Sequence, residues 1–305
     1  IYNYLGYAYY ELDNIKQSLL AFKNSIQLNP YDQDIYYRLG LIYEKLLQPT
    51  QAIQNYEQAF NMGYNDMDLI YRLGIILYDG DQFKESLPYL RTYVLSNPND
   101  IVVLEKLGNI LYTLNRFPEA ADIYKRLLEL DNTNIEYLEI IAKIYWNLEN
   151  YNKARDYYNI ILYMDYSNGE IFYNLGFIAN KNEEYELAKY YLSYAIECGY
   201  LHKDLYNQLS ITYINLEDYI HLIPILYEAL YIDPNNQNLI YDLGVAYYKI
   251  GFYKKSIEIL ERYFSTHPQD ATAAYYLGIS YYNIEDYKNS HSYLSLINNN
   301  SDYEI

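Results

Sequence analysis

The sequence has a single cysteine, Cys198, so no disulfide can form within the chain and cysteine usage does not reveal the redox compartment. No run of about 18 apolar residues occurs, which excludes a membrane-spanning helix. Cations are few, because 22 Lys and Arg stand against 40 Asp and Glu, and the net charge is −18. This balance repels phosphate backbones and anionic membrane surfaces, so we expect no nucleic acid partner and no membrane insertion. The sequence predicts a soluble protein, with the cytoplasm as the favoured compartment.

Motifs for catalysis and cofactor binding are missing as well. The sequence contains no phosphate loop, dinucleotide fingerprint, nucleophile elbow or zinc-protease motif. Its 4 histidines occupy unrelated places in the repeat described below, so they cannot converge on a metal ion. We therefore expect no enzyme activity, no cofactor and no metal site in this chain.

The sequence does have a strict internal period. A small residue returns every 34 residues without a slip. The series is Gly6, Gly40, Gly74, Gly108, Ala142, Gly176, Ser210, Gly244 and Gly278. A fixed period of this length is typical of a stacked-repeat solenoid, in which each repeat packs on its neighbours.

Two helical patterns follow one another in each repeat. When the small residue is taken as position 8, apolar residues recur at positions 4, 7, 8 and 11, which form one face of an α-helix. A second helical stripe occupies positions 17, 20, 21, 24, 27 and 28. Each repeat is therefore predicted to be a helix A, a short turn and a helix B. Glycine inside a helix costs about 0.5–1 kcal/mol relative to alanine, so we expect position 8 to allow a close approach of the two helices.

The remaining glycines and two of the prolines carry further expectations. Five glycines fall at turns between helices, where we expect left-handed backbone: Gly63, Gly80, Gly169, Gly199 and Gly251. Pro88 and Pro224 both occupy position 22, in the middle of helix B, and should kink or locally break it. A deliberate bend and a kink tolerated on the outer face both remain open.

These positions together resemble the tetratricopeptide repeat: a small residue at 8, Leu at 7, aromatic residues at 11 and 17, small or apolar residues at 20 and 27, and Pro at 32. The resemblance covers the whole chain as a single array, 1–305, and implies an all-α fold, a right-handed α-solenoid of antiparallel helix pairs with helix A on the concave side. The array has an incomplete repeat, 1–32, followed by 33–66, 67–100, 101–134, 135–168, 169–202, 203–236, 237–270 and 271–304. Because Ile1 falls two residues into a repeat, we expect further sequence upstream.

By similarity to the family, positions 2, 5, 6, 9, 12 and 13 of helix A line a concave groove. Positions 5 and 12 are rich in aromatic rings with a polar tip, a combination enriched in binding hot spots. The candidates are Tyr37, Tyr71, Tyr173, Tyr241 and Tyr275 at position 5, and Tyr78, Tyr112, Trp146, Tyr248 and Tyr282 at position 12. The alternative is a general overuse of tyrosine, of which the chain holds 47.

Position 6 carries cations in three consecutive repeats, namely Arg38, Arg72 and Lys106. Stacked one repeat apart, they are predicted to form a cationic row that binds a carboxylate of a ligand. The alternative is pairing within each helix, since Asp34 and Asp68 precede the two arginines by four residues. Such pairs contribute only about 0.3–0.5 kcal/mol each.

The predicted function is a non-enzymatic protein–protein interaction scaffold that binds a peptide or protein segment in its concave groove. One alternative is the substrate-recruiting arm of a larger enzyme, such as a glycosyltransferase, whose catalytic part lies outside this sequence. Another is a self-assembling structural element. The expected partner is a protein or peptide whose identity the sequence does not give, and homo-oligomerisation remains open.

Overall fold

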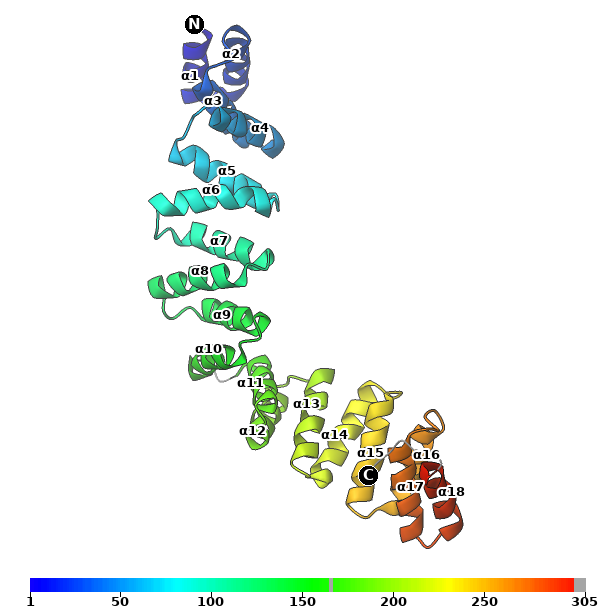
Figure 1. Ribbon diagram of the computed structural model, residues 1–305. Coiled ribbons are helices and arrows are strands. Elements are labelled where there is room, and N and C mark those ends of the chain that lie inside the picture. Colours follow the sequence, from blue (N-terminus) through cyan, green and yellow to red (C-terminus); the bar gives the residue numbers. More distant parts are fainter. Residues whose placement is uncertain (165–166, 299–305) are drawn as a thin grey trace. The chain divides into compact units, whose positions relative to one another are not determined.

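The chain folds into α-helices that follow one another in antiparallel pairs (Figure 1). The computed structural model describes residues 1–164 and 167–298. Within these ranges the chain forms 18 helices and no strand. Two helices fall in each predicted repeat, which confirms both the helix A, turn, helix B pattern and the all-α solenoid class.

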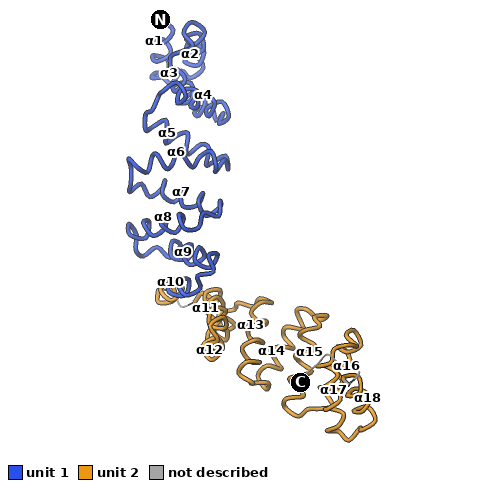
Figure 2. Tube along the Cα trace, in the orientation of Figure 1, with its two compact units in different colours: residues 1–157 blue, residues 158–305 orange. Residues whose placement is uncertain are grey.

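The helices belong to two compact units, residues 1–157 and 158–305, which Figure 2 distinguishes by colour. The boundary lies inside α10 (Tyr151–Met164). The first unit contains α1 (Tyr2–Glu11), α2 (Ile15–Leu28), α3 (Gln33–Lys45), α4 (Pro49–Asn61), α5 (Met67–Asp79), α6 (Phe83–Ser96), α7 (Ile101–Thr113), α8 (Phe117–Leu130) and α9 (Ile135–Asn147). The second contains α11 (Gly169–Lys181), α12 (Tyr185–Glu197), α13 (Lys203–Asn215), α14 (Tyr219–Ile232), α15 (Gln237–Lys249), α16 (Tyr253–Phe264), α17 (Ala271–Asn283) and α18 (Tyr287–Asn298).

Helix A begins in most repeats after an Asp or Asn side chain at position 34. The Asp66 carboxylate accepts a hydrogen bond of 2.8 Å from the Asp68 amide at the start of α5. Such a cap satisfies an amide that has no partner within the helix and stabilises the helix by about 1 kcal/mol. The same type of cap is made by Asp100, Asn134, Asn168, Asn236 and Asp270.

The turn between helices A and B has one left-handed residue per repeat, always at position 15. These residues are Asp13, Leu47, Asp81, Asn115, Glu149, Glu183, Glu217, Gly251 and Glu285. The left-handed backbone expected at Gly63, Gly199 and Gly251 is confirmed, with φ of 98°, 80° and 79°. The same expectation is wrong for Gly80, which has φ of −93° and immediately precedes the left-handed residue, and for Gly169, which begins α11.

Position 8 is the point where helix A meets helix B. A Cβ atom added to Gly74 would lie 2.5 Å from Leu90 Cδ2, and one added to Gly40 would lie 2.3 Å from Tyr56 Cε1. In every repeat with glycine here, the obstructing side chain comes from position 24 of helix B. The prediction that glycine permits a close approach is therefore confirmed. In three repeats a serine at position 20 also donates a hydrogen bond of 2.7–2.9 Å to the position 8 carbonyl: Ser18 to Gly6, Ser86 to Gly74 and Ser256 to Gly244.

The two prolines at position 22 do not interrupt their helices. Pro88 lies inside α6 and Pro224 inside α14, and both helices continue beyond the proline. The expectation of a local break is wrong because both prolines are exposed. Water can therefore satisfy the carbonyl that loses its helical partner.

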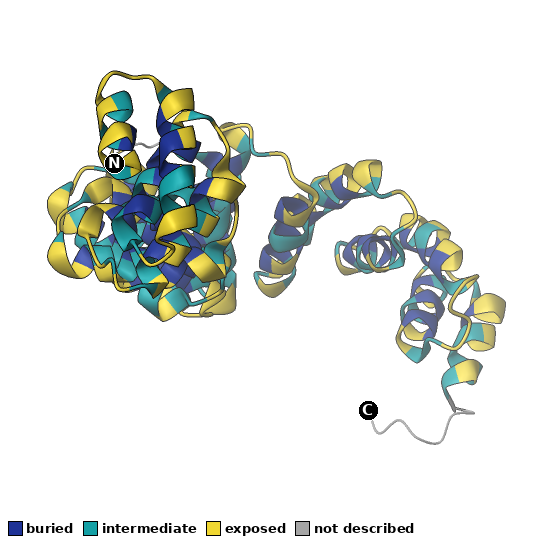
Figure 3. Ribbon diagram, turned by 90° about the horizontal axis from the view of Figure 1, so that it is seen from above, coloured by how far each residue is buried: buried dark blue, intermediate teal, exposed yellow. Residues whose placement is uncertain are grey.

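The core of each unit lies between the paired helices. Figure 3 shows buried residues on the helix sides that face a neighbour, and exposed residues on the loops and outer faces. The largest fully buried side chains include Phe22 and Tyr56 in the first unit and Phe172 in the second. Both helix A, through Phe172, and helix B, through Phe22 and Tyr56, therefore supply rings to the core.

Candidate partner-binding surfaces

An open cleft of about 490 Å³ lies in the third to fifth repeats of the first unit. It is lined mainly by helices A of these repeats, with a contribution from α8. The lining residues are Tyr78, Val102, Glu105, Lys106, Asn109, Tyr124, Glu136, Tyr137 and Ile140. Most of them occupy positions 2, 5, 6, 9 or 12 of helix A. The positions that were expected to face a groove therefore converge here.

The polar atoms of this cleft are held in place by contacts between repeats. The Lys106 ammonium lies 4.1 Å from the centre of the Tyr78 ring and 3.1 Å from an Asp79 carboxylate oxygen. The Tyr78 hydroxyl accepts a hydrogen bond of 2.7 Å from the Asn109 amide. The Tyr137 hydroxyl donates to Glu105 across the next repeat boundary. Groups fixed in this way lose little freedom when a partner binds.

Three aromatic residues at position 12 follow one another along α5, α7 and α9. Each ring packs against the aromatic residue at position 17 of its own repeat. The pairs of ring centres are Tyr78–Phe83 at 5.5 Å, Tyr112–Phe117 at 5.6 Å and Trp146–Tyr151 at 5.4 Å. All three position 12 rings are half-buried. We call Tyr78, Tyr112 and Trp146 the aromatic stripe of the first unit.

The two position 5 tyrosines of the first unit differ in burial. Tyr37 is only 7% exposed, stacks on Tyr64 with 4.8 Å between ring centres, and donates its hydroxyl to Asp68. Its assignment as a partner-binding residue is corrected, because this side chain belongs to the core. Tyr71 is half-buried and packs on Tyr93 at 5.0 Å.

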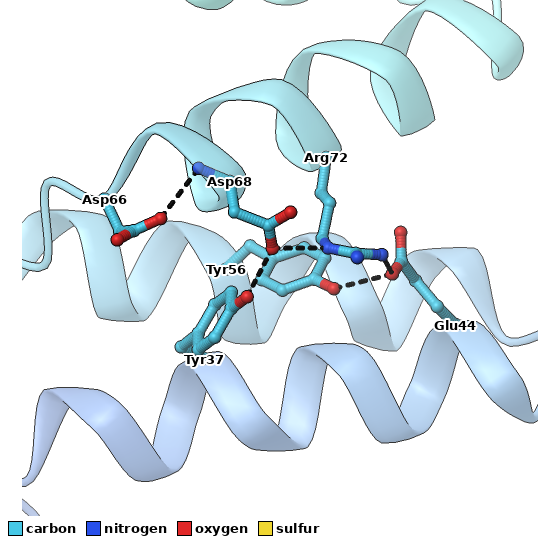
Figure 4. A network of polar contacts seen from close by, with 6 residues as sticks. All are labelled: Tyr37, Glu44, Tyr56, Asp66, Asp68 and Arg72. Atoms are coloured by element: carbon cyan, nitrogen blue, oxygen red, sulfur yellow. Dashed lines mark hydrogen bonds and ion pairs between the residues drawn. The ribbon is translucent and has the colours of Figure 1, made fainter.

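Arg72 connects the second and third repeats through two carboxylates (Figure 4). Its Nε atom lies 2.6 Å from Asp68 on the same helix, and its Nη1 atom lies 2.8 Å from Glu44 on α3. The Tyr56 hydroxyl donates to the same Glu44 oxygen at 2.8 Å. Burial opposes ionisation of Asp68, but hydrogen bonds from Arg72 and Tyr37 outweigh it and lower the Asp68 pKa. The same contacts raise the pKa of Arg72 against the effect of its burial.

The other two cations of the predicted row also lie near carboxylates. The Arg38 Nε atom lies 3.8 Å from an Asp34 carboxylate oxygen. The Arg38 guanidinium also lies over two tyrosine rings, 5.2 Å from the centre of the Tyr7 ring and 5.4 Å from the centre of the Tyr37 ring. Lys106 is paired with Asp79 as described above. Arg72 and Lys106 are therefore neutralised by close ion pairs, and a ligand carboxylate would have to displace these partners. Arg38 Nε makes no hydrogen bond with the described residues, and its contact with Asp34 is long.

The second unit carries a separate group of tyrosines on α15 and α17, which we call the C-terminal tyrosine cluster. It consists of Tyr241, Tyr248, Tyr275 and Tyr276. Tyr276 is central, with its ring centre 4.9 Å from that of Tyr248, 5.6 Å from Tyr275 and 6.4 Å from Tyr241. Sequence reasoning missed Tyr276 because only cations were considered at position 6.

The other two candidates of the second unit lie outside this cluster. Tyr282 is 58% exposed and contacts Tyr287, with 5.6 Å between ring centres. Tyr173 stacks on Tyr200 at 5.2 Å, two repeats away from the cluster.

Asp242 is a carboxylate at position 6 that the sequence analysis did not single out. It is half-buried on α15, and burial alone raises its pKa to about 6 from an ordinary value of 3.8. It makes no hydrogen bond or ion pair with any residue that the structure describes. The sequence signal was available, since position 6 otherwise faces the groove and only this repeat places an acid there.

Replacing Asp242 with asparagine should stabilise the fold at neutral pH. The raised pKa means that the folded state binds the proton more tightly between pH 3.8 and 6, so the ionised side chain weakens the fold above that range. A full shift of this size corresponds to roughly 3 kcal/mol, and partial exposure reduces the expected gain to about 1–2 kcal/mol. Thermal melts at several pH values should show a higher Tm for Asp242→Asn at pH 8 and a difference that closes toward pH 4. An equal Tm at pH 8 would contradict the burial argument.

Neither a metal centre nor a membrane span was found in the part of the chain that the structure describes. No group of three or more His, Cys, Asp or Glu side chains in residues 1–164 and 167–298 is placed to hold a metal ion. None of the described helices has the length and hydropathy that crossing a bilayer requires.

Several solved structures share this arrangement of helices. YrrB, described as a TPR protein with an unusual peptide-binding site, has a TM-score of 0.53 and 20% identity over 60% of this chain and 95% of its own. The C-terminal part of a TPR repeat-containing protein from Cytophaga hutchinsonii has a TM-score of 0.52 and 18% identity over 80% of this chain and 99% of its own. A chain of the Naa15/Naa10 complex bound to HypK-THB has a TM-score of 0.62 and 13% identity over 97% of this chain but only 46% of its own. At these identities the likeness concerns the fold. No curated protein sequence matches this chain.

Two family models, both described as tetratricopeptide repeat, match five segments. One matches residues 71–135 and 241–294, and the other matches 33–62, 135–168 and 204–236. Together they cover more than half of the chain, in the register set by the small residue at position 8. The paired helices and their close contact at position 8 agree with these matches. The chain therefore belongs to the tetratricopeptide repeat family.

Proposed function

We propose that this chain is a non-enzymatic protein-interaction scaffold whose first unit binds a peptide segment of a partner. Its family and its solenoid fold support the scaffold role. The binding surface consists of the cleft beside α7 and the aromatic stripe of Tyr78, Tyr112 and Trp146.

One observation carries this proposal, namely that each ring of the aromatic stripe is held in place by contacts with other side chains of the chain. A ring at position 17 packs against it, and two of the hydroxyl tips accept hydrogen bonds from the next repeat. Asn109 donates to Tyr78 at 2.7 Å, and Asn147 donates to Tyr112 at 3.3 Å. Rings that are already ordered lose little entropy when they are covered, which favours them as binding anchors.

The open cleft beside the stripe suits an extended or helical peptide. Its lining combines apolar side chains with Lys106, Glu105 and Glu136, so it can accept a segment of mixed polarity. Its volume of about 490 Å³ is enough for several side chains of such a segment.

The test is selection of a displayed random peptide library on the wild-type chain, followed by affinity measurements on variants. Replacing Tyr78, Tyr112 and Trp146 together with alanine should weaken the selected peptides by about 30-fold or more, because a single hot-spot truncation already costs about 2 kcal/mol. The matched control replaces three highly exposed tyrosines of other surfaces, Tyr31, Tyr163 and Tyr231, with exposures of 84%, 94% and 86%.

Circular dichroism should show that both triple variants keep their helices. Peptides that bind the stripe variant as tightly as the wild type, or that lose affinity only with the control variant, would show that this surface is not the binding site.

A further inference from the structure

The eighth repeat has a carboxylate, Asp242, that makes no ion pair with any cation in the described part of the chain. Asp242 is half-buried, and burial is the one cause of its raised pKa. On α15 and the neighbouring helix A, α17, the single cation is Lys249, and its ammonium lies over the Tyr219 ring at 5.8 Å. At the same repeat position in the first unit, Arg72 is matched by two carboxylates. The second unit therefore has a partly desolvated carboxylate, Asp242, that a cation of a partner could neutralise.

The C-terminal tyrosine cluster lies on the same two helices, α15 and α17. Tyr241 precedes Asp242 directly, and the pKa of Tyr241 is raised by burial first and then by charges that include Asp242. The Asp242 carboxylate therefore lies close enough to the Tyr241 hydroxyl for its charge to oppose ionisation of that hydroxyl. Tyr276 connects Tyr241 with Tyr248, at 6.4 Å and 4.9 Å between ring centres. The faces of such rings attract ammonium and guanidinium groups.

In two places in the first unit, a tyrosine ring and a carboxylate together bind a lysine ammonium group. Lys45 lies 4.6 Å from the centre of the Tyr10 ring and 3.1 Å from Asp13. Lys106 lies 4.1 Å from the Tyr78 ring and 3.1 Å from Asp79. In both cases a position 12 tyrosine and a carboxylate share one ammonium group. In the second unit the position 12 tyrosine Tyr248 and the carboxylate of Asp242 lie on the same helix, with Asp242 six residues earlier, and no lysine stands between them in the sequence.

We propose that the face formed by α15 and α17 binds a cationic side chain, an arginine or a lysine, of a partner segment. Asp242 supplies the counter-charge, and the C-terminal tyrosine cluster supplies the aromatic contact. This inference rests on the proposed function, since it requires that the chain binds a segment of a partner. It adds that the segment carries a positive charge and that part of it binds to the second unit. The net charge of −18 attracts such a segment from a distance.

The test uses the whole chain and a fluorescent peptide of alternating arginine and serine. A second peptide has citrulline in place of arginine, which keeps the shape and removes the charge. Fluorescence anisotropy at low ionic strength should show that the wild type binds the arginine peptide clearly better than the citrulline peptide. Asp242→Asn should weaken the arginine peptide about tenfold, because a hydrogen-bonded charge pair is lost, and should leave the citrulline peptide unchanged.

Two further variants separate this site from general attraction to an acidic protein. Glu258→Gln removes one negative charge from an exposed residue of helix B in the same repeat, and it should leave the affinity within a factor of two. Tyr276→Leu should weaken the arginine peptide about threefold, whereas Tyr276→Phe should keep wild-type affinity because the ring face remains. Since Asp242→Asn is expected to melt above the wild type, its loss of affinity cannot result from unfolding.

Equal affinities of the wild type and Asp242→Asn for the arginine peptide would overturn the inference, as would equal binding of the citrulline peptide. The variant with alanine at Tyr78, Tyr112 and Trp146 distinguishes this outcome from failure of the proposed function. If the library peptides lose affinity for that variant while Asp242→Asn has no effect, the proposed function stands and the cationic site is wrong. If the arginine peptide depends on Asp242 while the stripe variant binds the library peptides normally, the partner binds in the second unit and the first-unit site is wrong.

Discussion

Replacing Gly74 with leucine should lower the free energy of unfolding of the first unit by about 3 kcal/mol. A Cβ atom at this position would lie 2.5 Å from Leu90 Cδ2 and 3.3 Å from Tyr89 Cβ, so even the first added atom overlaps helix B. A leucine must push α5 and α6 apart, and overpacking of this kind costs about 1–3 kcal/mol or more. It also moves the Gly74 carbonyl away from the Ser86 hydroxyl, which donates to it at 2.7 Å.

The measurement is urea denaturation combined with hydrogen exchange. Because each repeat is stabilised by its neighbours, the loss of protection should begin in α5 and α6 and spread to the second and fourth repeats first. Gly80→Leu is the matched control, since Gly80 ends the same helix, is exposed and has φ of −93°. Five other repeats already have leucine at this position, for example Leu46 and Leu114. Equal stability of Gly74→Leu and Gly80→Leu would refute the close-packing explanation of the 34-residue period.

The second large effect is expected from Arg72→Met. This change leaves the half-buried Glu44 carboxylate and the Asp68 carboxylate, which is 45% exposed, without their shared cation at the contact between α3 and α5. Removing one partner of a buried pair costs about 3–5 kcal/mol, and the partial exposure of this network reduces the expected loss to about 2 kcal/mol. Urea denaturation at pH 7 measures it. Lys45→Met, which breaks the exposed pair with Asp13, should change stability far less.

The pH dependence of this loss has a definite sign. Hydrogen bonds from Arg72 and Tyr37 overcome the effect of burial and lower the Asp68 pKa below its unfolded value. The ion pair therefore stabilises the fold at and above neutral pH, and this contribution disappears as pH falls through the lowered pKa. The gap between the wild type and Arg72→Met should narrow below about pH 4, where the carboxylates become protonated. A gap that is the same at pH 3 and pH 7 would mean that Arg72 acts through packing of its carbon chain.

The repeated part of the fold could be predicted because it is determined by local sequence. The period, the two helical stripes and the close approach at position 8 each depend on residues within one repeat. The left-handed turn was misplaced in the third repeat, where it falls one residue after Gly80, at Asp81. Glycine was a poor guide because an Asp, Asn or Glu occupies this turn in most repeats. A short polar side chain such as that of Asp or Asn tolerates such a conformation.

The candidate site was harder to predict, because partners come from neighbouring repeats. Tyr37 and Tyr71 both occupy position 5, yet the first donates to Asp68 of the next repeat and lies in the core. Whether a hydroxyl meets a carboxylate depends on how two repeats stack, which no single 34-residue pattern contains. Asp242 was missed for a related reason. What distinguishes it is that no neighbouring cation pairs with it, and a single repeat does not show which residues of other repeats are its neighbours.

Hydrogen bonds from phenol hydroxyls to carboxylates tie several repeats together, as from Tyr37 to Asp68, Tyr137 to Glu105 and Tyr281 to Glu261. Burial, and in some cases the acceptor carboxylate, raises the pKa of many tyrosines, to about 12 for Tyr124, Tyr173 and Tyr263. An unfolded tyrosine ionises near pH 10, so alkali favours the unfolded chain as soon as pH exceeds about 10. A phenolate at Tyr37 or Tyr137 would also face the carboxylate that had been its hydrogen-bond acceptor, in a chain whose net charge is already −18. The same tyrosines that join the repeats at neutral pH therefore make this protein labile in alkali, with neighbouring repeats separating together over a narrow range of pH.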